Sequence, residues 1–250
     1  MMRKPTFLTY EKPLLTCMVQ AETPDRIKEL VARSEGAEAF GMQFCKMKPE
    51  YRTKETYREL FSLAAPLPTY VTNYRYGYNE GKSDEELAEG ILELAECGAT
   101  LCDVMGDLFD KQDDELARDE GAIQKQMKLI DELHARGAEV LMSSHVFKFT
   151  PAERVLEIAL EQKRRGADIA KIVTKSTSME EQIENMRIVH LLKQELGIPF
   201  LFLANGDSHI LRRVGGILGN CTTLCVVEYD ELATKTQPLL SEMKQIRDLM

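Results

Sequence analysis

The chain has 250 residues, of which 44% are hydrophobic and 29% charged, and this is the composition of an ordinary globular protein. No apolar run approaches the roughly 20 residues that cross a bilayer, so we expect neither a membrane protein nor a membrane partner. The net charge of −9 argues against a nucleic-acid partner, because proteins that bind a phosphate backbone carry a basic surface, and it favours a small-molecule site.

The amino-terminal stretch does not have the pattern of a secretory leader, because Glu11 and Lys12 interrupt the apolar run that a leader needs. Six cysteines are scattered through apolar stretches and do not follow the spacing of a disulfide framework. Cys221 and Cys225 stand four residues apart, which is a weak indication of a metal site. We therefore expect a cytoplasmic chain with reduced cysteines in its core and no metal.

In chain order, short apolar strands alternate with amphipathic helices. We expect strands near residues 14–20, 38–44, 68–74, 100–105, 138–144, 168–174, 199–204 and 222–227. We expect helices near residues 24–34, 54–64, 83–97, 119–135, 151–165, 178–195, 208–218 and 238–249. Three of these helices are expected to begin with a hydroxyl cap, at Thr23, Ser83 and Thr150.

One sequence pattern recurs where helices lead into strands: an amphipathic helix, then Gly-Ala, then a short apolar strand. Its glycines, Gly36, Gly98, Gly137 and Gly166, are expected to end their helices in a left-handed cap. No linker or change of composition divides the chain, and no G-x-G-x-x-G phosphate loop follows the first strand. Eight alternating units therefore predict the α/β class and a single (β/α)8 barrel domain over residues 1–250, with its active site at the carboxyl ends of the strands.

The sixth predicted strand carries a lysine among apolar residues. In "ADIAKIVTK", Ile169, Lys171 and Val173 share one face of the strand, and Ala170 and Ile172 share the other. Both faces of a barrel strand are covered, so we expect Lys171 to be buried. Burial favours the neutral amine, which is the nucleophile that forms a Schiff base. The alternative is a lysine that pairs with a carboxylate or reaches the rim.

A histidine and a glutamate follow neighbouring strands. His145 ends the strand before that of Lys171, and adjacent parallel strands lie about 4.8 Å apart, so we expect His145 to act as acid and base beside the lysine. Glu80, in the loop "YNEGK" after the third strand, is expected to orient the histidine, although capping or solvation explains most such acids. His209 opens the seventh helix and is a further candidate.

At these residues the chain resembles type I 3-dehydroquinate dehydratase, a Schiff-base lyase of the shikimate route. "MSSHVFKFTPAE" at 142–153 is similar to the family's serine-X-histidine-X-phenylalanine stretch followed by Thr-Pro, and "GADIAKI" at 166–172 is similar to its Gly-Ala-Asp-Ile-X-Lys strand. Weaker similarity covers nearly the whole chain. The resemblance implies a cytoplasmic homodimer that needs no cofactor, because the imine is itself the electron sink.

Carried over position by position, the resemblance implies that Lys171 forms the imine and that His145 is the general acid and base. Glu80, in "EGK", stands where the family has the carboxylate behind the histidine. Arg212, in "ILRRVGG", stands where the family's arginine holds the substrate carboxylate, and Gln237, in "ATKTQP", resembles a substrate-binding glutamine.

The second and third strands depart from the family pattern. The family has Glu-X-Arg on its second strand, where this chain has Gly41 and Gln43 in "FGMQF". The family's third-strand arginine corresponds to Tyr76, and Arg75 lies one place away. These differences remove charged groups that help to bind ring hydroxyls.

The fourth strand and the eighth loop differ as well. Met105 replaces an expected glutamate, although Asp103 is kept, and Ala233 or Thr234 stands near the family's serine. We expect substrate contacts from Arg212, Gln237, Arg75, Tyr76, Gln43 and Thr234, and the differences put the substrate in question more than the type of reaction.

Three functions stay open at this point. The chain dehydrates 3-dehydroquinate, or it applies the same imine chemistry to another keto-carboxylate as a dehydratase or aldolase-like lyase. The third alternative is a barrel-shaped binding or regulatory protein without activity.

Overall fold

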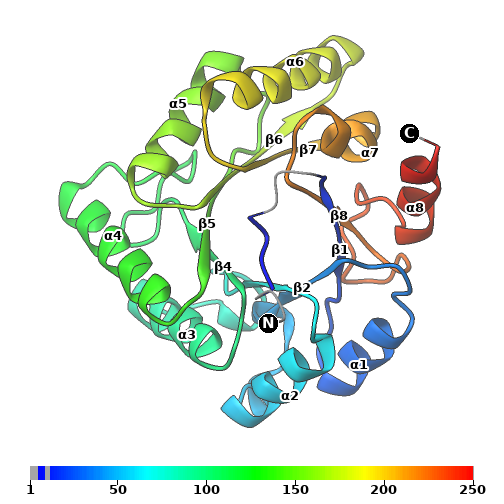
Figure 1. The fold of residues 1–250 in the computed structure, drawn as a ribbon. Helices are drawn as coiled ribbons and strands as arrows, with labels where there is room; N and C mark the ends of the chain where they lie inside the picture. Colours follow the sequence, from blue (N-terminus) through cyan, green and yellow to red (C-terminus); the bar gives the residue numbers. More distant parts are fainter. Residues whose placement is uncertain (1–4, 9–11, 250) are drawn as a thin grey trace.

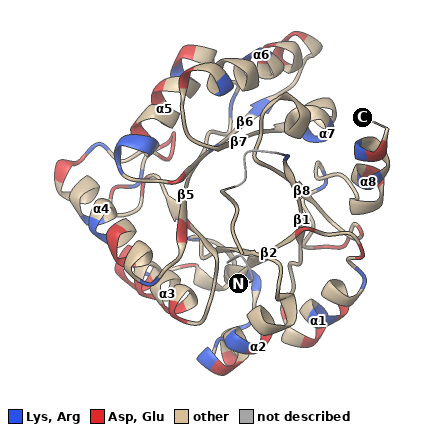
Figure 2. Ribbon diagram, viewed as in Figure 1, with Lys and Arg blue, Asp and Glu red and all other residues tan. Residues whose placement is uncertain are grey.

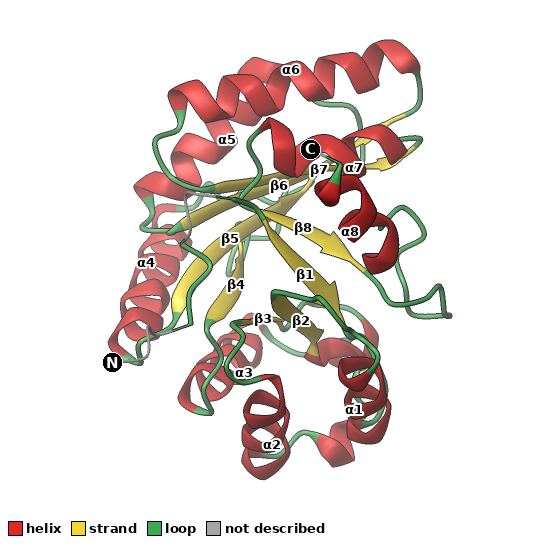
Figure 3. Cartoon of the chain, turned by 45° about the vertical axis from the view of Figure 1, so that its right-hand side comes forward, coloured by secondary structure: helices red, strands yellow, loops and turns green. Residues whose placement is uncertain are grey.

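A computed structural model describes residues 5–8 and 12–249 of the chain. In these residues eight parallel strands alternate with eight α-helices, and the strands form a nearly closed ring with the helices outside it (Figure 1). The expected (β/α)8 barrel is confirmed. In a view turned by 45° about the vertical axis, the strands again lie within the shell of helices (Figure 3).

The strands are β1 Leu14–Met18, β2 Ala39–Gln43, β3 Thr69–Thr72, β4 Leu101–Met105, β5 Glu139–His145, β6 Ile169–Ser176, β7 Phe200–Gly206 and β8 Thr222–Cys225. The helices are α1 Pro24–Ala32, α2 Lys54–Ala64, α3 Asp84–Glu96, α4 Glu120–Ala135, α5 Ala152–Arg164, α6 Met179–Glu195, α7 His209–Leu218 and α8 Leu240–Asp248. Three short 3-10 helices, which the sequence did not indicate, are η1 Phe44–Lys46, η2 Pro49–Tyr51 and η3 Gly77–Asn79.

The strands pair in the order β7-β6-β5-β4-β3-β2-β1-β8, and a side chain helps to close the ring between β7 and β8. The Asn220 amide exchanges two hydrogen bonds of 2.9 Å with the backbone of Phe202, and the Cys221 N–H donates to the Phe200 carbonyl at 2.9 Å. Phe7 is 1% exposed and packs edge-on against Tyr70 of β3 inside the barrel.

The helix ends follow the sequence patterns with one exception. Thr23 and Ser83 cap α1 and α3, and the recurrent glycines before β2, β4, β5 and β6 have φ values of 88°, 113°, 80° and 101°. The expected hydroxyl cap of α5 is wrong. Pro151 occupies the cap position without a side-chain hydrogen bond, and the Thr150 hydroxyl donates to the Lys148 carbonyl, because the proline places the threonine one residue too early.

The strand faces divide the core into two layers. Ile169 packs with Leu141 and Leu201 inside the barrel, whereas Ala170 and Ile172 pack against α5 and α6. The predicted division of the β6 faces is therefore confirmed, and Lys171 lies on the inner one. All six cysteines are free and buried.

Lys, Arg, Asp and Glu are interspersed along the outer helices (Figure 2). Within residues 5–8 and 12–249, no helix combines the length and the apolar character that a membrane span requires.

Candidate active site

A cavity of about 660 Å³ lies at the carboxyl ends of the strands, where a (β/α)8 barrel carries its chemistry. The residues predicted to act in catalysis or substrate binding line it, with the exceptions of Glu80 and the further candidate His209. They are Lys171, His145, Arg212, Gln237, Arg75, Tyr76, Gln43 and Thr234. The curvature of the barrel thus brings together side chains from β2 to β8.

Lys171 lies at the floor of this cavity and is 4% exposed. Its Nζ atom lies 2.8 Å from the Tyr70 hydroxyl, 2.7 Å from the Tyr74 hydroxyl and 3.1 Å from Asp103 Oδ2. The predicted burial is confirmed. Lys171 also has a carboxylate partner, Asp103, as the alternative interpretation predicted. It is therefore both paired and directed into the cavity.

Asp103 is the centre of this polar cluster at the floor. Its Oδ2 accepts hydrogen bonds from the hydroxyls of Tyr70 and Tyr74, and its Oδ1 accepts one from Ser143 Oγ at 2.5 Å. The Asp103 side chain is fully buried, and every contact it makes is to a donor or a cation. A buried carboxylate satisfied in this way holds the lysine nitrogen in one place.

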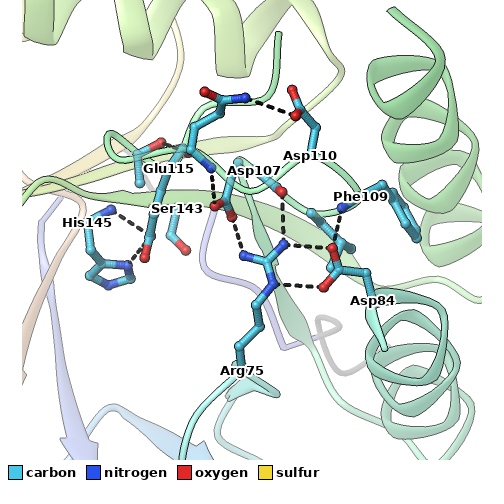
Figure 4. A network of polar contacts seen from close by, with 12 residues as sticks. Arg75, Asp84, Asp107, Phe109, Asp110, Glu115, Ser143 and His145 are labelled. Atoms are coloured by element: carbon cyan, nitrogen blue, oxygen red, sulfur yellow. Dashed lines mark hydrogen bonds and ion pairs between the residues drawn. The ribbon is translucent and has the colours of Figure 1, made fainter. Parts of the chain in front are cut away.

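His145 lies two residues beyond Ser143, the partner of Lys171 in the β5–β6 register. Glu115 Oε2 lies 2.7 Å from His145 Nδ1 and 2.7 Å from its backbone nitrogen (Figure 4). Because a carboxylate only accepts hydrogen bonds, Nδ1 carries the proton in this contact. Nε2 is then the nitrogen that is left to take a proton from a substrate.

Glu80 is not the partner of His145, which corrects the expectation from the sequence. It follows η3, is exposed and does not line the cavity. The neighbouring residue Asn79 is buried and donates to the Tyr74 carbonyl at 2.9 Å, so the anchored side chain of this turn is Asn79 and Glu80 faces outward. Glu115 comes from the acidic loop after β4, where the sequence does not distinguish it from the acids around it.

The backbone around Glu115 is held at several points. Glu115 has a φ of 47°, which is uncommon for a residue other than glycine, and its carbonyl accepts a hydrogen bond of 2.7 Å from Ser144 Oγ. The buried Arg165 guanidinium donates to the carbonyls of Gly106 and Ala117, which lie on either side of Glu115 in this loop. These bonds fix the position from which the carboxylate reaches His145.

Arg75 lines the cavity, but its guanidinium is bound to two carboxylates. It makes a two-pronged contact with Asp84 at 2.7 and 2.8 Å and donates to Asp107 Oδ1 at 2.6 Å and to the Asp107 carbonyl at 2.9 Å (Figure 4). Burial acts to raise the pKa of Asp84, but the hydrogen bonds from Arg75 leave it below its ordinary value. This arrangement joins the loops after β3 and β4.

Arg212 on α7 is a buried cation whose polar contacts are neutral groups. Its Nε donates to the Ala204 carbonyl at 3.0 Å and its Nη2 to Asn205 Oδ1 at 2.7 Å. Burial lowers its pKa to about 10. Gln237 in the loop before α8 is 4% exposed, and its Oε1 has no hydrogen-bond partner among the described residues. Both side chains therefore retain capacity to bind a ligand in the cavity.

The cavity-lining side chains at the ends of β2 and β4, Gln43 and Met105, are neutral. Gln43 accepts a hydrogen bond of 3.2 Å from the Tyr76 hydroxyl, and Met105 lines the wall at the end of β4. A side chain at Gly41 would require Met18 to move, because an added Cβ would lie 2.1 Å from the Met18 sulfur. These side chains carry no charge, whereas Lys111 and Asp113 from the loop after β4 also line the cavity and are charged.

The remaining candidates lie outside this centre. His209 begins α7 and is exposed outside the cavity. In the part of the chain that the structure describes, no group of His, Cys, Asp and Glu has the arrangement of a metal site. Thr234 is half-buried and lines the cavity, and among the described residues its hydroxyl has no side-chain hydrogen-bond partner.

The sequence matches a family model and several curated proteins. The model of the type I 3-dehydroquinase family matches residues 47–250. The 3-dehydroquinate dehydratase of Geobacillus thermodenitrificans is 33% identical over 92 residues, which is 36% of each chain. That of Klebsiella pneumoniae is 27% identical over 146 residues, 57% of this chain and 56% of the relative. The match spans a third to about half of the length of these relatives.

Solved structures resemble the whole barrel. The type I 3-dehydroquinate dehydratase of Clostridium difficile, with covalently modified comenic acid, has a TM-score of 0.80 at 16% identity and covers 100% of this chain and 98% of its own. The 3-dehydroquinate dehydratase of Geobacillus kaustophilus has a TM-score of 0.81 at 17% identity and covers 96% of this chain and 91% of its own. At these identities the likeness shows the fold.

Proposed function

Because the chain belongs to the type I 3-dehydroquinase family, we propose that it is a hydro-lyase that dehydrates a keto-carboxylate through an imine on Lys171. One observation carries the proposal. A buried lysine, a histidine with a free Nε2 and a buried arginine with no acidic partner among the described residues line the same cavity. The first candidate substrate is 3-dehydroquinate.

The reaction begins when the Lys171 ammonium gives up one proton, so that its nitrogen has the lone pair with which it attacks the substrate ketone. The ammonium has three N–H protons, the protonated imine keeps one, and the other two leave with the ketone oxygen as water. The positive charge stays on the nitrogen, where Asp103 lies 3.1 Å away. The imine then draws electrons from the neighbouring carbon, so no further electron sink is needed.

Elimination follows from the imine. Nε2 of His145 takes a proton from the carbon next to the imine, which forms an enamine and an imidazolium that Glu115 stabilises. The enamine expels the β-hydroxyl, and the imidazolium protonates it as water. Hydrolysis of the conjugated imine returns the amine of Lys171 and releases an enone, so the net change is the loss of one water.

The carboxylate of the substrate binds Arg212 in this proposal. A charge-assisted contact to a buried guanidinium is strong because little water competes for it. Gln237 supplies an amide to a hydroxyl or carboxylate, and Thr234 adds a hydroxyl at the rim. Arg75 does not bind the substrate in this proposal, because its guanidinium is held by Asp84 and Asp107. It positions the loops after β3 and β4.

The neutral side chains at the ends of β2 and β4 favour a second candidate function, the same chemistry on a different keto-carboxylate. Gln43, Tyr76 and Met105 offer no ion to a ring that carries several hydroxyls. A substrate with fewer hydroxyls on this side leaves fewer polar groups without partners. Under this second candidate, the enone absorbance fails to develop with 3-dehydroquinate but develops with another β-hydroxy keto-carboxylate.

Reductive trapping tests the imine. The protein is treated with borohydride and a panel of keto-carboxylates that includes 3-dehydroquinate, and intact mass is compared with that of Lys171→Ala. The expected result is a substrate-sized mass increase in the parent protein and none in the variant. A parent protein that gains no mass with any member, at substrate concentrations that quench its tyrosine fluorescence, is a binding protein and contradicts the proposal.

We also propose that the chain forms a homodimer, as the family resemblance implies. Light scattering after size-exclusion chromatography gives the mass in solution. A mass of about twice 28.4 kDa is expected, and a mass of 28.4 kDa at all protein concentrations would contradict a dimer.

A further inference from the structure

One tyrosine contacts both the lysine and the histidine of the proposed reaction. The Tyr74 hydroxyl lies 2.7 Å from Lys171 Nζ, and the Tyr74 ring packs edge-on against the His145 imidazole with 5.4 Å between centroids. Among the described residues, no hydrogen bond joins Lys171 to His145. Tyr74 is therefore the side chain that lies between them.

A second tyrosine provides an internal comparison. Tyr70 also contacts Lys171 Nζ, and both hydroxyls donate to Asp103 Oδ2. Tyr74 lines the cavity, whereas Tyr70 does not and packs instead against Phe7 within the barrel. The two hydroxyls thus share the lysine and the carboxylate, but only that of Tyr74 faces the space where a substrate binds.

The state of the Tyr74 hydroxyl suits proton transfer in both directions. Burial, and after it the charge of Asp103, raise the pKa of Tyr74 well above its ordinary value, so the hydroxyl keeps its proton. A neutral phenol has one proton to donate and lone pairs that accept another. The titratable groups that face it are Lys171, Asp103, Tyr70 and His145, with Tyr76 packed against its ring.

We propose that Tyr74 is a third catalytic residue, whose hydroxyl transfers protons between the Lys171 nitrogen and the ketone oxygen while the imine forms. As the C–N bond forms, the phenol donates its proton to the ketone oxygen and receives one from the nitrogen, which gives the carbinolamine with the positive charge still on its nitrogen. A second transfer of the same kind accompanies cleavage of the C–O bond and releases water. The phenol is regenerated each time, and no oxidant or reductant takes part.

This inference rests on the proposed function and divides its proton transfers between two residues. Tyr74 transfers protons while the imine forms and while it hydrolyses, whereas His145 removes the proton from carbon and protonates the departing β-hydroxyl. His145 is suited to the second task because its Nδ1 is held by Glu115 and its Nε2 is free. Tyr70 then positions the lysine without exchanging protons with the substrate.

Isotope exchange separates the two tasks. The probe is 3-oxocyclohexane-1-carboxylate, a keto-carboxylate without a β-hydroxyl, which can form an imine but cannot eliminate. Loss of ¹⁸O from its labelled ketone reports formation and hydrolysis of the imine, and uptake of deuterium from D₂O reports removal of the proton on carbon. Both are measured for the parent protein, Tyr74→Phe, Tyr70→Phe and His145→Gln, with Lys171→Ala giving the background.

The expected result is that Tyr74→Phe slows ¹⁸O loss by about 100-fold, the lower range of a general acid or base, whereas Tyr70→Phe slows it by less than about tenfold. His145→Gln is expected to retain ¹⁸O loss and to abolish deuterium uptake. Both tyrosine variants remove one buried hydroxyl beside Asp103, so a purely structural effect lowers their rates equally.

Three outcomes overturn the inference. In the first, Tyr74→Phe and Tyr70→Phe lose ¹⁸O at rates within threefold of each other. In the second, His145→Gln abolishes ¹⁸O loss whereas Tyr74→Phe retains it. Both results leave the proposal of an imine on Lys171 intact. In the third, the parent protein loses no more ¹⁸O than Lys171→Ala does. This result would show that no imine forms with this class of ketone, and Tyr74 would then have no such proton transfer to perform.

Discussion

Glu115 Oε2 lies at 2.7 Å from two nitrogen atoms of His145, Nδ1 of the ring and the nitrogen of the backbone. One carboxylate oxygen thus sets the tautomer of the imidazole and its orientation relative to β5. The acid comes from the loop after β4, next to the strand of the histidine it serves. The expected acid, Glu80, lies one loop earlier in the barrel.

Glu115→Gln should lower the rate at which His145 removes the proton from carbon by about 10- to 100-fold. The amide keeps the shape of the side chain, but it carries no charge to stabilise the imidazolium that forms when His145 takes the proton. Deuterium uptake by the keto-carboxylate probe measures the step directly.

Glu80→Gln is the matched control, because it makes the same chemical change on an exposed loop outside the cavity. We expect deuterium uptake within twofold of the parent protein. If Glu80→Gln slows the exchange more than Glu115→Gln does, the carboxylate behind the histidine has been assigned wrongly.

The fold follows from local patterns in the sequence. The alternation of short apolar strands with amphipathic helices predicts every barrel strand and α-helix to within a few residues, and the glycines that precede β2, β4, β5 and β6 mark the turns. Lys171 and His145 could be placed because a barrel has its site at the strand ends.

The contacts between side chains did not follow from these patterns. Asp103 on β4 reaches Lys171 on β6 across the intervening strand, because the wall of the barrel curves and both side chains point inward. Glu115 depends on a left-handed backbone conformation in an irregular loop rich in acids. Neither arrangement has a periodic signal, since both depend on how distant segments pack.

Arg212→Met should raise KM for a keto-carboxylate by about 10- to 100-fold, since a hydrogen bond to a charged group contributes about 1.5–3 kcal/mol. The methionine fills much of the same volume but offers no cation to the carboxylate. Steady-state kinetics measure the change. Arg213→Met, the neighbouring position on α7 that pairs with Glu242, is the control and should leave KM within twofold. Equal changes in both variants would argue for a general effect on α7.

Arg75→Met should destabilise the protein by about 2 kcal/mol, because it leaves Asp84 and the buried Asp107 without their shared cation. For a chain of this size the midpoint of thermal unfolding should fall by about 4–8 °C. Lys125→Met, which removes an exposed ion pair with Glu85, is the control and should shift the midpoint by less than about 2 °C. An Arg75→Met protein with unchanged stability and a large rise in KM would instead favour direct binding of substrate by Arg75.

The loop that carries Gln237 is tied to α1 through Glu228, and this tie should depend on pH. Hydrogen bonds from Arg33 and then Arg26 lower the pKa of Glu228 to about 2. A carboxyl whose pKa is depressed in the folded state stabilises that state fully above its unfolded pKa, near 4.3, and this stabilisation is lost as the pH falls toward the folded value. Glu228→Gln should therefore lower the unfolding midpoint by about 2 °C at pH 7, and the difference from the parent protein should shrink between pH 4.5 and pH 2.

Glu231→Gln, an exposed position in the same loop, is the control and should show no such dependence. A Glu228→Gln difference of the same size at pH 7 and at pH 2.5 would show that the lost interaction does not involve the charge of the carboxylate.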